Sequence, residues 1–228
     1  MALYMNGQEI SQSSGVLISG VGATEPYIEE IYNSDGQLIS ANMHGYDAIR
    51  SYMFSDCPNL ALNSLPNSIT SIGKYAFQNC SNLALTSLPS GVTSIGSYAF
   101  YGCSNLALTS LPSGITSISS YAFYDCPKLA FTSLPSGITS IGVGAFQKCT
   151  KLALTSLPSG ITSIGINAFE KCTGLTSITF TGKPTSIANN AFNGCTNLTT
   201  INVPWANGAV ANAPWGATNA TINYGYAG

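Results

Sequence analysis

The stretch CSNLALTSLPSGITSISSYAFYDC, residues 103 to 126, is repeated almost unchanged in the segments that directly precede and follow it. CSNLALTSLPSGVTSIGSYAFYGC precedes it at residues 80 to 103, and CPKLAFTSLPSGITSIGVGAFQKC follows it at residues 126 to 149. A cysteine recurs every 23 residues along most of the chain: Cys57, Cys80, Cys103, Cys126, Cys149, Cys172 and Cys195. Six equal spacings predict a repeat protein in which each copy is one coil of a solenoid.

The apolar residues hold fixed places in each repeat. Counted from Cys103, leucine or isoleucine stands at the third, fifth, eighth, twelfth and fifteenth places, and Ala122 and Phe123 stand at the nineteenth and twentieth. One coil cannot bury this apolar side alone, so stacked coils must bury it against one another. Apolar residues two or three apart, alternating with Ser, Thr and Gly, favour short parallel strands and turns. The segment SYAF-x-x-C is the best place for a helical turn. We therefore expect an α/β repeat.

The consensus LxxxxLPxxIxxIxxxAFxxCxxL resembles the BspA-like leucine-rich repeats found on bacterial cell-surface proteins. The resemblance covers about residues 34 to 203 and implies a leucine-rich-repeat solenoid capped at both ends.

One departure from the family pattern leaves the strand register open. Family members carry an aliphatic residue at the sixth place after the cysteine, as Ile178 and Ile201 do. Five repeats carry a polar residue there and an apolar residue one place earlier, namely Leu62, Leu85, Leu108, Phe131 and Leu154. Either a bulge turns these side chains inward or they form an exposed stripe. Burial of a leucine side chain is worth about 1.5–3 kcal/mol, which favours the inward alternative.

Both ends depart from the repeat. Residues 1–33 are expected to form an N-terminal β-hairpin cap, with tight turns at Asn6-Gly7 and at Asp35-Gly36. Residues 34–203 form the expected solenoid, in which 34–56 are a degenerate first repeat with Ser34 in place of the cysteine. Residues 204–228 form the expected C-terminal cap. There Trp205 and Trp215 either seal the last coil or stack on a sugar. This tail is similar to those of leucine-rich repeat proteins from gut bacteria and their prophages.

The composition limits the partners and the location. Of 228 residues, 7% are charged and the net charge is −2, so the chain offers no electrostatic footprint for nucleic acid or an anionic membrane. It has no apolar run of the roughly 20 residues that a membrane span requires, and its first residues do not read as a signal peptide. A neutral polar surface is typical of exported proteins, so an extracellular, cell-surface or phage-particle location is expected.

No residue set predicts catalysis or a cofactor. Single cysteines 23 residues apart do not form a metal pair, and we expect all seven to be buried and reduced. His44, the only histidine, has Asp47 nearby but no positioned nucleophile. No nucleotide-binding glycine motif is present, so no enzyme activity, cofactor or metal is expected.

Tyrosines supply the candidate binding surface. The eighteenth place is tyrosine in four successive repeats, and two more tyrosines follow three residues on: Tyr52, Tyr75, Tyr98, Tyr121, Tyr101 and Tyr124. Aromatic side chains serve both sugar binding and protein hot spots, although rings that only pack along the flank would give the same pattern. The sequence thus predicts a non-enzymatic recognition or adhesion module for a protein or carbohydrate on a cell surface. The alternative is a structural spacer or assembly element of a surface or phage-tail protein.

Overall fold

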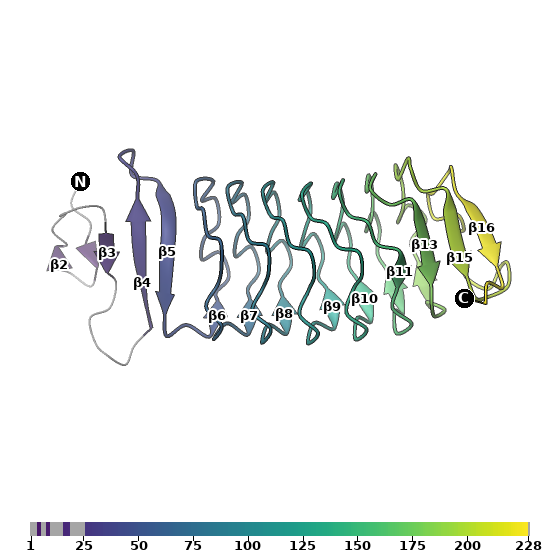
Figure 1. Cartoon of the computed structure of the whole chain (residues 1–228), viewed down its shortest axis with the longest axis horizontal. Helices are drawn as coiled ribbons and strands as arrows, with labels where there is room; N and C mark the ends of the chain where they lie inside the picture. Colours follow the sequence, from purple (N-terminus) through teal and green to yellow (C-terminus); the bar gives the residue numbers. More distant parts are fainter. Residues whose placement is uncertain (1–3, 6–7, 10–15, 19–25, 228) are drawn as a thin grey trace.

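The computed structural model describes residues 4–5, 8–9, 16–18 and 26–227. They form an elongated body in which successive coils follow one another along the long axis (Figure 1). We number the coils 1 to 7 by their residues: coil 1 is 34–56, and coils 2 to 7 are the 23-residue segments that begin at Cys57, Cys80, Cys103, Cys126, Cys149 and Cys172.

Short parallel strands join the coils on one side. They are β6 (Ala48–Ile49), β7 (Ser71–Ile72), β8 (Ser94–Ile95), β9 (Ser117–Ile118), β10 (Ser140–Ile141), β12 (Ser163–Ile164) and β14 (Ser186–Ile187). β6, β7 and β8 form one sheet, and β9, β10, β12 and β14 form another. Partners are 23 residues apart, as Ser140 and Ser163 show, so every isoleucine of the column enters the core. The parallel-coil prediction is confirmed.

The second strand column settles the register question. It contains β11 (Ser156–Leu157), β13 (Ser177–Phe180), β15 (Thr200–Val203) and β16 (Thr221–Tyr224), all parallel. In β13, Ile178 and Phe180 alternate inward as in a regular strand. In the earlier coils the fifth-place and eighth-place side chains both point inward, which leaves two exposed polar residues between them and interrupts the strand. The fifth-place residues are all buried, so the inward alternative is correct: Leu62, Leu85, Leu108, Phe131 and Leu154.

The predicted helical turn is wrong: the described residues contain no helix. In an α-helix each N–H bonds to the carbonyl four residues earlier. In the SYAF segment Phe100 N–H instead donates to Ala122 O of the next coil at 2.9 Å, and Tyr98 N–H donates to Ser120 O at 3.1 Å. Every second backbone donor is therefore used between coils, whereas Ala99 and Tyr101 donate to the carbonyl three residues earlier, so the segment is a chain of turns.

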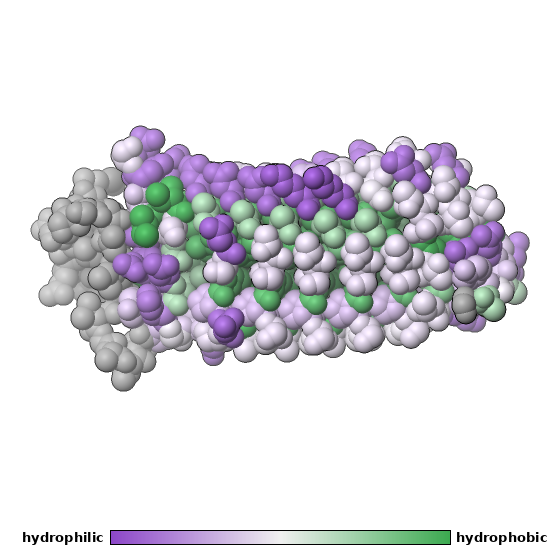
Figure 2. All heavy atoms as spheres, viewed as in Figure 1, coloured by the Kyte–Doolittle hydropathy of each residue, from purple (hydrophilic) through white to green (hydrophobic). Residues whose placement is uncertain are grey.

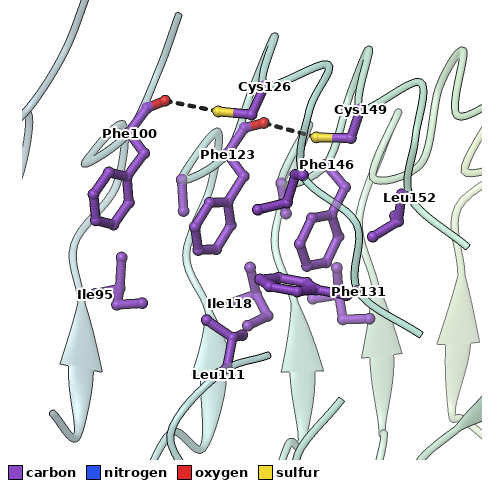
Figure 3. Packing of buried hydrophobic residues seen from close by; sticks show 14 of the residues in the cluster. Ile95, Phe100, Leu111, Ile118, Phe123, Cys126, Phe131, Phe146, Cys149 and Leu152 are labelled. Carbon is purple, nitrogen blue, oxygen red and sulfur yellow. Dashed lines mark hydrogen bonds between the residues drawn. The ribbon is translucent and has the colours of Figure 1, made fainter. Parts of the chain in front are cut away.

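The phenylalanines and cysteines of these turns form a buried seam. Phe100, Phe123 and Phe146 stack with ring centroids 5.5–5.6 Å apart. Cys126 Sγ donates to Phe100 O at 3.0 Å, and Cys149 Sγ donates to Phe123 O at the same distance (Figure 3). In equivalent bonds each of the other buried cysteines donates to the carbonyl 26 residues earlier, so the thiols link successive turns of the seam.

The expectation that all seven cysteines are buried and free needs one correction. All seven are free thiols and six are buried, but Cys57 is only half-buried. The other six thiols each donate to a carbonyl of an earlier coil, whereas a hairpin takes the place of that coil before Cys57. Burial raises the pKa of the Cys80 and Cys195 thiols to about 12, and raises those of Cys103, Cys126, Cys149 and Cys172 further above the ordinary value.

Antiparallel strands form the N-terminal end of the body, and the last of them lies within coil 1. β4 (Tyr27–Tyr32) pairs with β5 (Leu38–His44) around a turn that contains Asp35 and Gly36, which confirms the second hairpin. β3 (Val16–Ile18) pairs with the other edge of β4. β1 (Tyr4–Met5) pairs with β2 (Gln8–Glu9), and the turn predicted at Asn6-Gly7 between them lies outside the described residues. β5 falls in the segment expected as a degenerate repeat, whose later residues Ile49 and Phe54 are buried in the stack.

The two tryptophans pack inside the C-terminal end. Trp205 is 6% exposed and Trp215 is fully buried, and both rings contact Phe180. Trp215 Nε1–H donates to Ala211 O at 2.7 Å. The side chains therefore seal the last coil, and their burial excludes them from stacking on a sugar.

Candidate binding surface on the turn strip

The side chains that differ most between coils lie beside the SYAF turns. We call the residues at the seventeenth, eighteenth, twenty-first and twenty-second places of coils 1 to 7 the turn strip. Because the coils repeat along one axis, each place forms a column of side chains parallel to that axis. Figure 2 shows this general property of the body: side chains of similar hydropathy gather in rows along its length.

The eighteenth column is a stack of tyrosine rings. The ring centroids of Tyr52 and Tyr75 are 4.8 Å apart, those of Tyr75 and Tyr98 are 4.7 Å apart, and those of Tyr98 and Tyr121 are 4.9 Å apart. Interplanar angles of 18–21° make each pair stacked. The structure therefore brings all four predicted tyrosines of this column together.

The other two predicted tyrosines form a second, shorter stack in the twenty-first column. Tyr101 and Tyr124 are stacked at 4.4 Å, and Tyr101 also lies 5.8 Å from Tyr98 in a tilted arrangement. Tyr121 and Tyr124 are 6.0 Å apart. Coils 3 and 4 consequently hold a cluster of four tyrosines, two on each coil.

The backbone under the main stack has an unusual conformation. Tyr52, Tyr75, Tyr98 and Tyr121 all have positive φ, between 56° and 62°. Residues other than glycine reach this left-handed region at a cost of about 1–2 kcal/mol, and asparagine is among the few that tolerate it. In coils 5 and 6 the same place, with φ 57°, is occupied by Gly144 and Asn167. The sequence analysis missed this left-handed conformation, although the replacement of Tyr by Gly and then by Asn in the same column was a signal for it.

The stacking decides which parts of the rings face a partner. Tyr75 and Tyr98 each have another tyrosine ring stacked on both faces. The Tyr121 ring has Tyr98 on one face and the Gly144 backbone on the other, because a Cβ atom added to Gly144 would lie 2.4 Å from Tyr121 Cε1. These three rings present edges and hydroxyl groups to solvent. Tyr52, at the end of the stack, is 59% exposed.

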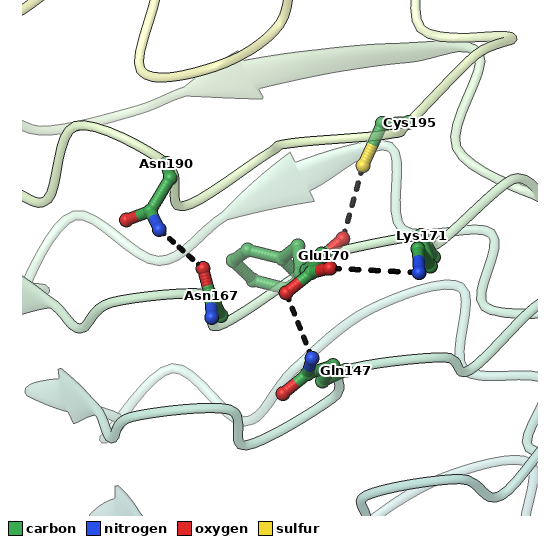
Figure 4. Close-up of polar contacts among 7 residues, drawn as sticks. Gln147, Asn167, Glu170, Lys171, Asn190 and Cys195 are labelled. Atoms are coloured by element: carbon green, nitrogen blue, oxygen red, sulfur yellow. Dashed lines mark hydrogen bonds and ion pairs between the residues drawn. The ribbon is translucent and has the colours of Figure 1, made fainter.

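The later coils continue the strip with amides and charges. Gln147 Nε2–H donates to Glu170 Oε2 at 2.7 Å, Lys171 Nζ lies 3.8 Å from Glu170 Oε1, and Asn190 donates to Asn167 (Figure 4). The Lys171 side chain is 59% exposed, whereas that of Glu170 is 13% exposed. The strip is therefore aromatic in coils 1 to 4, whereas in coils 5 to 7 it is polar apart from Val143 and Ile166 at the seventeenth place.

Two lysines border the tyrosines. Lys74 Nζ lies 5.0 Å from the ring centroid of Tyr75, and Lys148 Nζ lies 4.9 Å from that of Tyr124. The Tyr124 hydroxyl raises the pKa of Lys148, which keeps the ammonium charged. Burial, together with the neighbouring phenols, raises the pKa of Tyr98 and of Tyr101. At neutral pH the Tyr98 and Tyr101 hydroxyl groups therefore stay protonated, with the charged Lys148 beside them.

Other candidate chemistry is not assembled in the described part of the chain. The exposed His44 ring stacks on Tyr27 at 4.4 Å, and its expected neighbour Asp47 uses its backbone carbonyl to accept a bond from Thr70. Among the residues that the structure describes, no group of three or more His, Cys, Asp or Glu could hold a metal ion. The same residues include no helix long and apolar enough to cross a membrane.

Comparisons with known proteins agree with this architecture. The pattern of the BspA type leucine rich repeat region matches six copies, over residues 47–153 and 116–211. A leucine rich cell surface protein from Faecalibacterium prausnitzii is 28% identical with a TM-score of 0.62, over 82% of this chain and 54% of that protein. The leucine rich repeat protein of T. pallidum is 28% identical with a TM-score of 0.53, over 76% of this chain and 80% of that one.

A third structure shares the fold alone. The pneumococcal vaccine antigen PcpA is 19% identical with a TM-score of 0.51, over 82% of this chain and 46% of the antigen. This chain spans about half the length of the Faecalibacterium protein. No curated protein matches the sequence. The repeat pattern covers well over half of the residues, and the chain belongs to the BspA-type leucine-rich repeat family.

Proposed function

We propose that this chain is a non-enzymatic recognition and adhesion module that binds a partner on a cell surface through the turn strip. The observation that carries the proposal is the tyrosine column in the left-handed backbone conformation. Gly144 and Asn167 show that the solenoid needs no aromatic residue at this place. Four successive coils nevertheless keep tyrosine, a residue with a backbone penalty there, and strained positions of this kind concentrate at functional sites.

A protein partner is favoured over a carbohydrate. Sugars bind aromatic residues mainly through a free ring face, and the faces of Tyr75, Tyr98 and Tyr121 are covered by each other, by Tyr52 and by Gly144. Ring edges and hydroxyl groups remain, and tyrosine is enriched at protein interfaces because it combines an apolar body with a hydrogen-bonding tip.

An exposed leucine stripe or a bare end cap would favour the spacer alternative, and the structure bears on the stripe. An exposed leucine stripe would have favoured assembly through the strand face, and that column is buried instead. The similar protein from Faecalibacterium prausnitzii is a cell surface protein, which supports the proposed location. Association with a phage particle remains a prediction.

The test replaces three tyrosines with the residue that the chain itself uses at the same φ. In Tyr75→Asn/Tyr98→Asn/Tyr121→Asn, loss of stacking, about 0.5–1.5 kcal/mol per pair, is offset in part by relief of the backbone strain, so the fold should survive. Tyr226→Asn is the matched control, because Tyr226 is 43% exposed and lies outside the strip.

Binding is measured to intact host and bacterial cells, to the same cells treated with protease or glycosidase, and to a glycan array. We expect the triple variant to bind at least tenfold more weakly and the control to bind like the wild type. Protease treatment should remove the binding sites. Retained binding by a folded triple variant would refute the proposal, and binding to a glycan that survives protease treatment would make the partner a carbohydrate.

A further inference from the structure

We infer that the protein partner of the turn strip is a second copy of this chain, lying antiparallel on the first, so that adhesion is between like molecules. This inference rests on the proposed function, because it names the partner of the same surface. The two copies are related by a twofold axis that passes between coils 3 and 4. Such a closed interface is self-complementary: if one residue contacts a second, the second contacts the first across the axis.

The repeat distance favours a partner of the same kind. The rings of the eighteenth column recur every 4.7–4.9 Å, which is the spacing of neighbouring parallel strands. An extended peptide laid along the column rises about 6.6–6.8 Å between side chains on one face and loses register after one coil. A second copy has the same repeat in either direction, so an antiparallel copy keeps register along its length.

The aromatic residues lie where the axis passes. The axis places coil 3 of one copy opposite coil 4 of the other, coil 2 opposite coil 5, and coil 1 opposite coil 6. Tyr98 then faces the Tyr121 of the second copy, and Tyr101 faces its Tyr124. Both copies together place eight tyrosines at the centre of the interface. Binding hot spots are enriched in tyrosine and gather at the centre of an interface, with polar residues at the rim.

The antiparallel pairing brings unlike charges together at the ends of the twenty-second column. Asp56 of coil 1 is exposed and is opposed to the exposed Lys171 of coil 6, and the pair occurs twice in the dimer. Among the residues that the structure describes, the Lys171 ammonium contacts only Glu170, at 3.8 Å, and the other oxygen of Glu170 accepts from Gln147. Asn79 is opposed to Lys148, and Gly102 is opposed to Asp125, so no like charges meet in this column. In a parallel arrangement coil 1 would face coil 1 and coil 6 would face coil 6, so Asp56 would not meet Lys171.

The most exposed apolar side chains of the strip occupy matching ends. Tyr52 on coil 1 is 59% exposed and Ile166 on coil 6 is 52% exposed. The axis brings Tyr52 against the Ile166–Asn167 pair of the second copy. It also places Tyr75 opposite Gly144, which has no side chain to obstruct the ring. Both ends of the strip therefore gain apolar cover in the antiparallel pair.

Charge reversal tests the arrangement. Sedimentation velocity and light scattering of the whole chain, over 1–100 μM, give the dimer dissociation constant. Asp56→Lys and Lys171→Asp each place like charges together twice, so each should weaken the dimer roughly tenfold. The double variant Asp56→Lys/Lys171→Asp exchanges the two charges and should recover the wild-type constant. Asp47→Lys/Lys151→Asp and its single variants make the same changes of charge off the strip and should leave association unchanged.

The outcomes separate this inference from the proposed function. A wild-type chain that is monomeric at 100 μM, or a dimer that the single reversals leave unchanged, would overturn the antiparallel pair, whereas cell binding that depends on the tyrosines would still support the proposed function. Beads coated with the wild type should aggregate with one another, and free chain should inhibit them. Beads coated with the triple tyrosine variant should not aggregate.

Discussion

Alkaline pH should unfold this solenoid through its buried cysteines. Six thiols lie in the seam between coils, and burial raises the pKa of each above the value of 9.0 that an unfolded chain retains. A raised folded-state pKa means that the unfolded chain releases its protons first as pH rises. Stability is therefore complete below pH 9 and declines above it.

The magnitude follows from the proton balance. Between pH 7 and pH 9.5 one thiol with an unfolded pKa of 9.0 and a folded pKa of about 12 costs about 0.8 kcal/mol of unfolding free energy. Six such thiols give about 5 kcal/mol. The measurement is urea unfolding followed by circular dichroism at pH 7.0 and 9.5, under reducing conditions.

Variants assign the effect to the seam. Cys126→Ser/Cys149→Ser keeps the hydrogen-bond donors but removes two titrating groups, so its loss of stability between the two pH values should be smaller by about 1.7 kcal/mol. Cys57→Ser, at the half-buried cysteine, is the control and should recover less than half of that amount. A double variant with the full pH dependence of the wild type would refute the reasoning.

Three further predictions concern the packing. Leu108→Ala should destabilise by about 2–5 kcal/mol in thermal unfolding, whereas Thr109→Ala should change stability by less than about 0.5 kcal/mol; the reverse order would contradict the inward register. Gly144→Ala adds a Cβ atom 2.4 Å from a tyrosine ring at positive φ and should cost about 1–3 kcal/mol, whereas Gly137→Ala, with no atom closer than 3.8 Å, should be near neutral. In native protein a thiol reagent should modify Cys57 first and one group only, with six more after denaturation; several fast groups would argue against a buried seam.

The sequence was sufficient to predict the solenoid because its information is periodic. A cysteine, a phenylalanine and an isoleucine that recur every 23 residues can be buried together only if the coils stack. The same regularity brought the tyrosines into one column, so their stacking could be predicted without coordinates.

Other features depend on contacts between coils that no single repeat reveals. The helical turn was expected from local preference, but Phe100 donates its N–H to the next coil instead. The partial exposure of Cys57 depends on what precedes it in space. The register at Leu108 was undecided because a leucine at the fifth or the sixth place suits a strand equally, and only burial distinguishes them. The covered ring faces likewise required the distances between coils.

The most direct test of the central claim, that the turn strip is the recognition surface, is tyrosine footprinting of the chain, first free at a concentration where it is monomeric and then bound to cells. Oxidative labelling followed by mass spectrometry reports the accessibility of each tyrosine. We predict that labelling of Tyr52, Tyr98 and Tyr101 falls on binding while that of Tyr226 stays constant. Unchanged labelling of the strip, with protection elsewhere on the solenoid, would contradict the claim.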